Sequence, residues 1–157
     1  MSYITAKKHL EKNNLDDRII EFNTSTATVA LAAKALGVSD GEIAKSMSFI
    51  VNDNPILVIV AGDKKIDNHK YKDEFKVKAK MISFDDVETL IGHKAGGVCP
   101  FGINNNVRVY LDLSLKKYEY VYPACGTSNT AVKLLINELE KASKYIKWVD
   151  VCKEGEL

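Results

Sequence analysis

The chain has 157 residues, 46% of them hydrophobic, and a formal net charge of +1 at pH 7. This length and apolar content predict a single compact domain over residues 1–157, large enough to fold without disulfides or a structural metal. The near-neutral charge excludes the class of strongly basic nucleic-acid-binding proteins.

In the first half of the chain, apolar spacing and capping residues predict two helices, a short turn and three strands. The helices cover 5–13 and 26–36, and Gly37 follows the end of the second. Ser39 and Glu42 have the spacing of a capping box, which predicts one short helical turn. The expected strands are 19–22, 46–51 and 55–61, the last two joined as a hairpin by the turn-prone residues 52–54.

In the second half, Ser83 with Asp86 is expected to cap a helix that Gly92 ends. The other expected helices are 67–75 and 137–145, the expected strands are 79–82, 107–112, 119–123, 131–136 and 148–152, and residues 153–157 are expected to fray. Strands dominate, and they do not alternate regularly with helices. We therefore expect an α/β fold of the α+β type, with a mixed, strongly curved β-sheet or partial barrel surrounded by helices.

Two loops of small residues separate these elements. The first, residues 95–102, reads Ala-Gly-Gly-Val-Cys-Pro-Phe-Gly; Gly96 and Gly97 carry no Cβ to screen their amides, and Pro100 fixes the exit direction. The second, residues 124–130, reads Ala-Cys-Gly-Thr-Ser-Asn-Thr and adds hydroxyl groups. Such loops can hold a carbonyl oxygen or a ribose hydroxyl, although glycine and proline clusters are more commonly plain turns.

Five short motifs occur in a fixed order between about residues 23 and 139. They are Leu36-Gly37-Val38, Ile43-Ala44-Lys45-Ser46, Val60-Ala61-Gly62-Asp63, Gly96 with Pro100-Phe101-Gly102, and Gly126-Thr127-Ser128-Asn129-Thr130-Ala131. This order resembles the YbaK/prolyl-tRNA-synthetase-associated family of aminoacyl-tRNA editing domains. The resemblance implies the curved mixed sheet, a pocket that contains Lys45 and both loops, and no metal or organic cofactor.

The resemblance further implies a trans-acting deacylase that hydrolyses the ester of a mischarged tRNA. Cys-tRNA(Pro) and Ala-tRNA(Pro) are the expected substrates. The acceptor end of the tRNA is the expected partner, and prolyl-tRNA synthetase is an additional candidate. Two alternatives stay open: a non-catalytic module that binds an aminoacyl-tRNA or a nucleotide, and a regulatory relative with a vestigial pocket.

Lys45 is the candidate charged residue of the pocket. By strand alternation it shares a face with Met47 and Phe49, so its ammonium lies either at a rim or in a pocket. By the resemblance, it helps to hold the aminoacyl-adenosine end of a tRNA. Together with the amides of Gly96 and Gly97, it would stabilise the oxyanion formed when water attacks the ester. No Ser/His/Asp or Cys/His arrangement is visible, so the resemblance implies that the substrate itself assists the hydrolysis.

The remaining candidate substrate-binding residues are Phe22, Cys99, Pro100, Phe101, Gly102, Gly126, Thr127, Ser128 and Asn129. Phe101 either stacks on the terminal adenine or fills the core beneath its loop. Cys99 flanks the pocket, but it and Cys125 are expected to be small space-fillers, because no nearby base would form a thiolate. His93 is either a general base or, more commonly for such a residue, a packing imidazole. His9 is expected on the surface.

Charge, cysteine spacing and targeting signals indicate the compartment and the partners of the protein. Seven lysines and four acidic residues lie between positions 63 and 80, which indicates either a solvated face or a rim that binds RNA phosphates. No apolar run is long enough to cross a membrane, and the N-terminus lacks a secretory pattern. The three cysteines lack disulfide or metal-ligand spacing. We therefore expect a cytoplasmic protein that makes no membrane contact.

Overall fold

A four-stranded mixed sheet forms the centre of the computed structural model, which describes residues 2–154. Its order is β2-β3-β5-β9, formed by β2 (Ala44–Val51), β3 (Asn54–Ala61), β5 (Arg108–Asp112) and β9 (Trp148–Val149). β2 and β3 are an antiparallel hairpin, whereas β5 runs parallel to β3 and to β9. Asn52 and Asp53 form the hairpin turn with positive φ angles, which asparagine and aspartate tolerate better than most residues. The predicted hairpin and mixed sheet are confirmed.

The sheet is a middle layer between two hydrophobic clusters. Residues 55–61 of β3 are all buried. Leu57 and Ile59 belong to a cluster on one face, whereas Ile56, Val58 and Val60 belong to a cluster on the other. A strand covered on both faces reads as a continuous apolar run, as this one does.

Three pairs of short antiparallel strands surround this sheet. They are β1 (Ile19–Glu21) with β7 (Thr130–Val132), β6 (Tyr120–Val121) with β8 (Leu134–Leu135), and β4 (Lys64–Ile66) with β10 (Cys152–Glu154). A parallel bridge between Ile43 and Tyr122 joins the segment after β6 to the start of β2. This bridge extends the strand pairing beyond the central sheet, in keeping with the predicted curved sheet.

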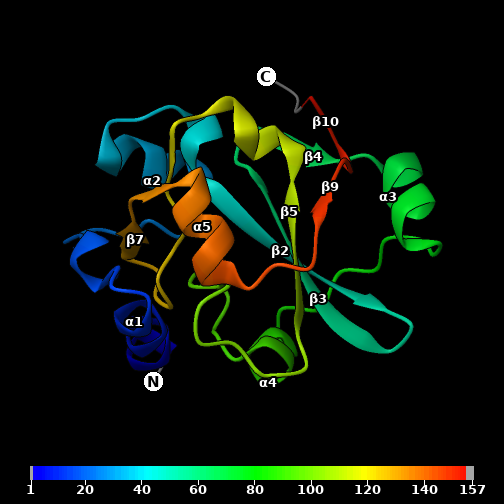
Figure 1. Ribbon diagram of the computed structural model, residues 1–157, viewed down its shortest axis with the longest axis horizontal. Helices are drawn as coiled ribbons and strands as arrows, with labels where there is room; N and C mark the ends of the chain where they lie inside the picture. The colour runs from blue at the N-terminus through cyan, green and yellow to red at the C-terminus, as the bar shows by residue number, and fades with distance from the viewer. Residues whose placement is uncertain (1, 155–157) are drawn as a thin grey trace.

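Helices cover both faces of the sheet (Figure 1). They are α1 (Ser2–Lys12), α2 (Val29–Leu36), α3 (Asn68–Phe75), α4 (Val87–Ile91) and α5 (Ile136–Ser143), with the 3-10 turns η1 (Asp16–Arg18), η2 (Asp40–Glu42) and η3 (Leu113–Lys117). α1, α4 and α5 contribute to the cluster that contains Leu57, whereas α3 contributes Tyr71 to the cluster that contains Val58. Within residues 2–154, no helix has the length and apolar character needed to cross a membrane.

Local signals located α2 well. The Thr28 hydroxyl accepts a hydrogen bond from the Leu31 amide, and Gly37 ends the helix with a φ of 72°. α4, in contrast, starts at Val87, later than the predicted start at Ser83. The Ser83 hydroxyl donates to the Asp86 carboxylate instead of capping a helix there.

Several predicted strands are wrong in extent. The strand expected at 79–82 is a single antiparallel bridge between Phe49 and Met81. The segment 131–136 is divided between β7, β8 and the first residue of α5, and 148–152 is divided between β9 and β10. β4 was not predicted. Residues 153–154 belong to β10, while 155–157 lie outside the described residues.

Candidate functional site

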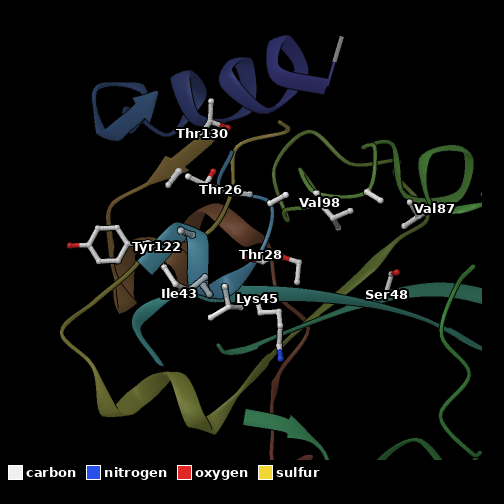
Figure 2. Close-up of a pocket in the computed structure, with 18 of the residues that line it drawn as sticks. Thr26, Thr28, Ile43, Lys45, Ser48, Val87, Val98, Tyr122 and Thr130 are labelled. Carbon is white, nitrogen blue, oxygen red and sulfur yellow. The ribbon is translucent and has the colours of Figure 1, made fainter. Parts of the chain in front are cut away.

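A cavity of about 380 Å3 lies between β2, the start of α2 and the first small-residue loop. Its walls come from residues 26–29, β2, residues 81–87 and residues 95–98, with further contributions from Tyr122 and the start of β7. Figure 2 shows Thr26, Thr28, Ser48 and Thr130 around this space. Most of the lining side chains are small and apolar or carry a hydroxyl, and Lys45 is the one charged residue among the described residues that line it. The cavity therefore offers shape and hydrogen bonds, without a cluster of ionised groups.

Side-chain alternation along β2 decides which residues face this cavity. The Ser48 side chain is on the cavity side, and the residue is 8% exposed (Figure 2). Ser46 has the same parity, and its hydroxyl oxygen is buried with no hydrogen-bond partner among the described residues. Two serine hydroxyls therefore belong to the cavity face of the strand.

Lys45 has the opposite parity. Its Nζ donates a hydrogen bond to the Lys64 carbonyl oxygen at 2.9 Å, and Figure 2 shows the ammonium on the side of β2 away from Thr28 and Ser48. Burial lowers the pKa of Lys45, against the opposing influence of the nearby Cys152 and Asp63. Lys45 thus shares a face with Met47 and Phe49, as strand alternation predicts. That face packs into the Val58 cluster, whereas Ala95 and Val98 of the first loop pack against the Leu57 cluster.

The two small-residue loops lie against each other, as their joint candidacy requires. The Gly126 amide donates to the Gly97 carbonyl at 3.0 Å, and the Gly97 amide donates to the Lys94 carbonyl at 3.0 Å. A Cβ on Gly97 would lie 2.4 Å from the Gly126 carbonyl carbon. Gly97 therefore permits the contact between the loops, and its amide is engaged within its own turn, which corrects the prediction of a bare amide there.

Gly96 differs from its neighbour. It lines the cavity and has a φ of +93°, a conformation that favours glycine. A Cβ there would meet only the Cβ atoms of Ser128 and Ala27, at 3.5 and 3.6 Å. Of the two adjacent glycines, Gly96 is the one at the cavity wall.

α1 supports both loops from behind. A Cβ on Gly102 would lie 2.4 Å from the Thr5 carbonyl carbon, and one on Gly126 would lie 2.5 Å from the Ser2 carbonyl oxygen. The Gly102 amide donates to His9 Nδ1 at 2.9 Å, and His9 Nε2 donates to the Ala142 carbonyl at 2.6 Å. The predicted surface position of His9 is therefore wrong, because this half-buried imidazole links α1, α5 and the first loop. Gly102 packs on α1 and does not line the cavity.

The second loop borders a neighbouring space of about 470 Å3, which it shares with the start of α1 and with Glu88 and Lys94. Thr127 and Ser128 line this space, and Ala95 lines both spaces, so the first loop separates them. Pro100 lies elsewhere, beside His9 in a separate hollow.

Phe22 and Asn129 line neither of these two spaces. The Phe22 amide donates to the Asn129 carbonyl at 2.9 Å, and the Asn129 side chain donates back to the Phe22 carbonyl at 3.1 Å. These two candidates join the end of β1 to the second loop.

Three residues in or just before the first loop are fully buried: His93, Cys99 and Phe101. The Phe101 ring packs edge-on against His9 at a centroid distance of 5.7 Å, so it fills the core and does not present a face to a base. His93 Nε2 lies 2.5 Å from the Phe101 carbonyl and donates to it. Burial lowers the pKa of His93 and raises the pKa of the Cys99 thiol. His93 Nε2 also lies 3.5 Å from Cys99 Sγ, which corrects the prediction that no base lies near this thiol. Because Nε2 donates to the Phe101 carbonyl and burial disfavours the thiolate, Cys99 acts as a space-filler and His93 as a packing imidazole in this structure.

The lysine-rich segment does not border the cavity. Lys64 forms an ion pair with Glu154 at 2.7 Å, and Lys70 pairs with Asp150 at 3.1 Å. Both lysines belong to elements that pack on the Val58 cluster, through Ile66 of β4 and Tyr71 of α3. Within the described part of the chain, no group of histidine, cysteine or acidic side chains is arranged to hold a metal ion.

The aminoacyl-tRNA editing domain family matches residues 23–142, a range that contains every residue lining the cavity. The chain belongs to this family. It is 46% identical over 157 residues to the uncharacterized protein YwhH of Bacillus subtilis, a match that covers 99% of this chain and all of YwhH. It is 25% identical over 133 residues to EbsC of Enterococcus faecalis, a proposed Cys-tRNA(Pro)/Cys-tRNA(Cys) deacylase, covering 82% of this chain and 81% of EbsC.

One solved structure and one tRNA ligase also resemble the chain. A proposed trans-editing enzyme for prolyl tRNA synthetase superposes with a TM-score of 0.87 at 27% identity, over 97% of each chain. The proline–tRNA ligase of Aquifex aeolicus is 32% identical over 94 residues, which span 56% of this chain and 16% of the ligase. These similarities confirm the family and the fold that the five motifs predicted.

Sequence reasoning missed the hydroxyl groups of the editing-domain cavity. Thr26 and Thr28 fall in the segment 26–36 that was predicted as a helix and was not singled out for binding, yet both precede α2 and line the cavity. Ser48 has the parity opposite to Lys45, so it lies on the face of the strand for which no binding role was predicted. The proximity of Thr26 and Thr28 to the glycine loop, about 70 residues along the chain, is visible only in the structure.

Proposed function

We propose that this editing-domain protein hydrolyses the ester of a mischarged tRNA in trans, with Cys-tRNA(Pro) or Ala-tRNA(Pro) as substrate. The observation that carries the proposal is the cavity of about 380 Å3 between the α2 start, β2 and Gly96. This volume is near the lower end of ligand pockets and suits a small amino acid joined to a ribose. Its hydroxyl-rich lining suits a polar, esterified ligand better than a purely apolar one.

The chemistry requires only water and the substrate. The oxygen of a water molecule attacks the ester carbonyl carbon, the bond from that carbon to the ribose oxygen breaks, and the ribose oxygen takes up a proton. The products are the free amino acid and a tRNA with a free terminal hydroxyl. The cavity hydroxyls of Thr26, Thr28 and Ser48 are ordinary alcohols with no special basicity. The ribose hydroxyl next to the ester is assigned to orient the water and relay its proton, because it is already held beside the reacting carbonyl.

Gly96 is assigned to stabilise the oxyanion. Because Gly96 lies at the cavity wall and has no side chain, an ester oxygen can approach its backbone directly. Removal of one oxyanion donor costs other enzymes about 2.7–4 kcal/mol of transition-state stabilisation. Gly97, whose amide donates to Lys94, is assigned to hold the two loops together.

Lys45 is assigned to a phosphate of the acceptor end. To reach it, the ammonium group leaves the Lys64 carbonyl oxygen and rotates about the flexible lysine stem. The exchange replaces a hydrogen bond from the ammonium to a neutral carbonyl with one to a phosphate, in which both partners are charged and attract each other.

The deciding experiment is single-turnover deacylation of Cys-, Ala- and Pro-tRNA(Pro), each with a normal terminal ribose and with the neighbouring hydroxyl removed. We expect hydrolysis of at least one mischarged tRNA. Loss of the hydroxyl is expected to slow it about 10²–10⁴-fold, the contribution of a well-placed acid–base group. Normal rates with the deoxy substrate would overturn the substrate-assisted mechanism. Tight binding of all three tRNAs without turnover would favour the non-catalytic binding module.

A further inference from the structure

An exposed aromatic ring stands at the cavity. Phe84 is 80% exposed and Met81 is 58% exposed, and both line the cavity. Among the large hydrophobic side chains exposed in the described part of the chain, Phe84 is the one aromatic residue. Two exposed apolar side chains at the edge of one cavity form a surface that a bound ligand can cover.

The segment that carries this ring is held on both sides. Before Phe84, the Ile50 amide donates to the Lys80 carbonyl at 2.9 Å, and the Ile82 amide donates to the Ser48 carbonyl at 3.1 Å. After it, the Asp86 and Val87 amides both donate to the Ser83 carbonyl, at 3.0 and 3.1 Å.

Packing adds to these hydrogen bonds, because Ile82 and Val87 on either side of the ring are buried in the core. The ring therefore projects from a backbone that is already ordered. Little conformational freedom remains to be lost when a flat ligand covers it.

We propose that Phe84, together with Met81 of the same cavity, is a stacking platform for the 3′-terminal nucleobase of the bound tRNA. The inference rests on the proposed function, since an ester held in the cavity places the base of the same nucleotide at the cavity mouth. Every nucleobase has a π-face, so the platform tolerates any base and serves to position the terminal nucleotide.

Local charge favours a base over a phosphate at this position. Asp85 and Asp86 follow the ring directly, and both are exposed. Their carboxylates repel the phosphate backbone and leave the neutral face of a base as the matching ligand group. Lys45, the charged residue among the described residues that line the cavity, is left for the phosphate once its ammonium has rotated from the other face of β2.

The first test compares Phe84→Ala, Phe84→Tyr and Ile146→Ala in deacylation. Ile146 is 55% exposed and does not line the cavity, so it controls for loss of an exposed apolar side chain. Phe84→Ala is expected to lower kcat/KM about 5–150-fold, mainly through KM, because one base–aromatic stack is worth this factor. Phe84→Tyr and Ile146→Ala are expected to retain the wild-type value. Equal activity of Phe84→Ala and wild type would overturn the platform and leave the proposed function standing.

The second test needs no catalysis. Tryptophan fluorescence of Phe84→Trp and of the matched Ile146→Trp is titrated with adenosine monophosphate and with ribose 5-phosphate, after subtraction of the wild-type signal. Saturable quenching of Phe84→Trp by the nucleotide alone supports the platform even if no tRNA is hydrolysed, in which case only the deacylase proposal fails. Absence of quenching, or equal quenching by ribose 5-phosphate, overturns the platform. So does a loss of Phe84→Ala activity that appears only when prolyl-tRNA synthetase is present, because it indicates a protein contact at the ring.

Discussion

The two faces of β2 differ in how completely they are filled. On the face that carries Phe49, the rings of Phe49 and Tyr71 lie 5.0 Å apart, and Phe75 extends the same cluster. On the face that carries Ser48, small side chains leave a cavity of about 380 Å3. Because side chains alternate along a strand, one segment of eight residues supplies the packing of one layer and the wall of a binding site in the other. Substitutions on the two faces should therefore change different measured quantities.

The largest effect is expected from Phe49→Ala. The side chain is fully buried between the sheet and α3, so its removal should lower the free energy of unfolding by about 3–5 kcal/mol. Urea unfolding followed by circular dichroism measures the change, with Ser48→Ala as the control from the other face. Equal losses for the two variants would abolish the distinction between the faces.

Lys45→Met tests the residue whose side chain starts at the cavity and ends on the opposite face. If Lys45 holds a phosphate of the substrate, kcat/KM should fall about 10–150-fold, because a hydrogen bond to a charged group is worth about 1.5–3 kcal/mol, while the free energy of unfolding changes little. Lys45→Arg keeps the charge and controls for it. A fall in stability that matches the fall in activity would show that Lys45 acts instead as a link between β2 and the Lys64 carbonyl.

A smaller effect is expected from Ser48→Val, which adds bulk to the cavity face. One extra methylene in a specificity pocket is worth about 1–3 kcal/mol, so kcat/KM should fall about 5–150-fold. The loss should be greater for Cys-tRNA(Pro) than for Ala-tRNA(Pro), since the larger amino acid has less room. The ratio of the two rates measures this, and an unchanged ratio would place the amino acid elsewhere.

The smallest effect concerns pH. Burial lowers the pKa of His9 and of His93, which border the first loop, so the folded state binds fewer protons than the unfolded state below the ordinary histidine pKa of about 6.5. Their stabilising effect is complete above that pH and is lost as the pH falls below it. In the aromatic cluster on the other face, burial raises the pKa of Tyr71 to about 12, so it stays neutral throughout.

Melting temperatures between pH 8 and pH 5 and hydrogen exchange of residues 93–102 measure this effect. We expect the loop to exchange faster in acid, after correction for the intrinsic rate, before the segment around Phe49 does. His9→Gln can retain a donor and an acceptor without titrating, so it should reduce the slope. An unchanged slope in this variant would assign the pH dependence to other groups.

Local rules predicted the elements whose ends are set by neighbouring residues. The Thr28 cap, Gly37 and the Asn52–Asp53 turn each act within a few positions, and α2 and the hairpin formed close to where they were expected. β4 and the division of 131–136 and 148–152 depend instead on partners far along the chain, because β4 pairs with β10 and β8 pairs with β6. A lysine-rich segment gives no local sign that it will pair as a strand.

The candidate site shows the same limit. Alternation correctly placed Lys45 with Met47 and Phe49, but only the packing of other elements decides on which face of β2 the cavity forms. Gly96 and Gly97 are alike in sequence, and their different roles follow from contacts with Ser128 and Gly126 in the second loop. The five motifs identified the family because they specify an ordered set of positions, whereas single residues did not specify their contacts.

The support that α1 gives to both loops implies a pattern of natural variation. The family match begins at residue 23, after this helix, yet Thr5 and Ser2 occupy the space that a Cβ on Gly102 or Gly126 would need. A side chain at 102 or 126 is incompatible with a helix in this place, and the two changes are coupled. Relatives that have such a helix should keep glycine at both positions. Where the helix is absent or displaced, the φ angles of +67° and +81° still disfavour most side chains, so only residues that tolerate a left-handed backbone, such as asparagine, should replace these glycines.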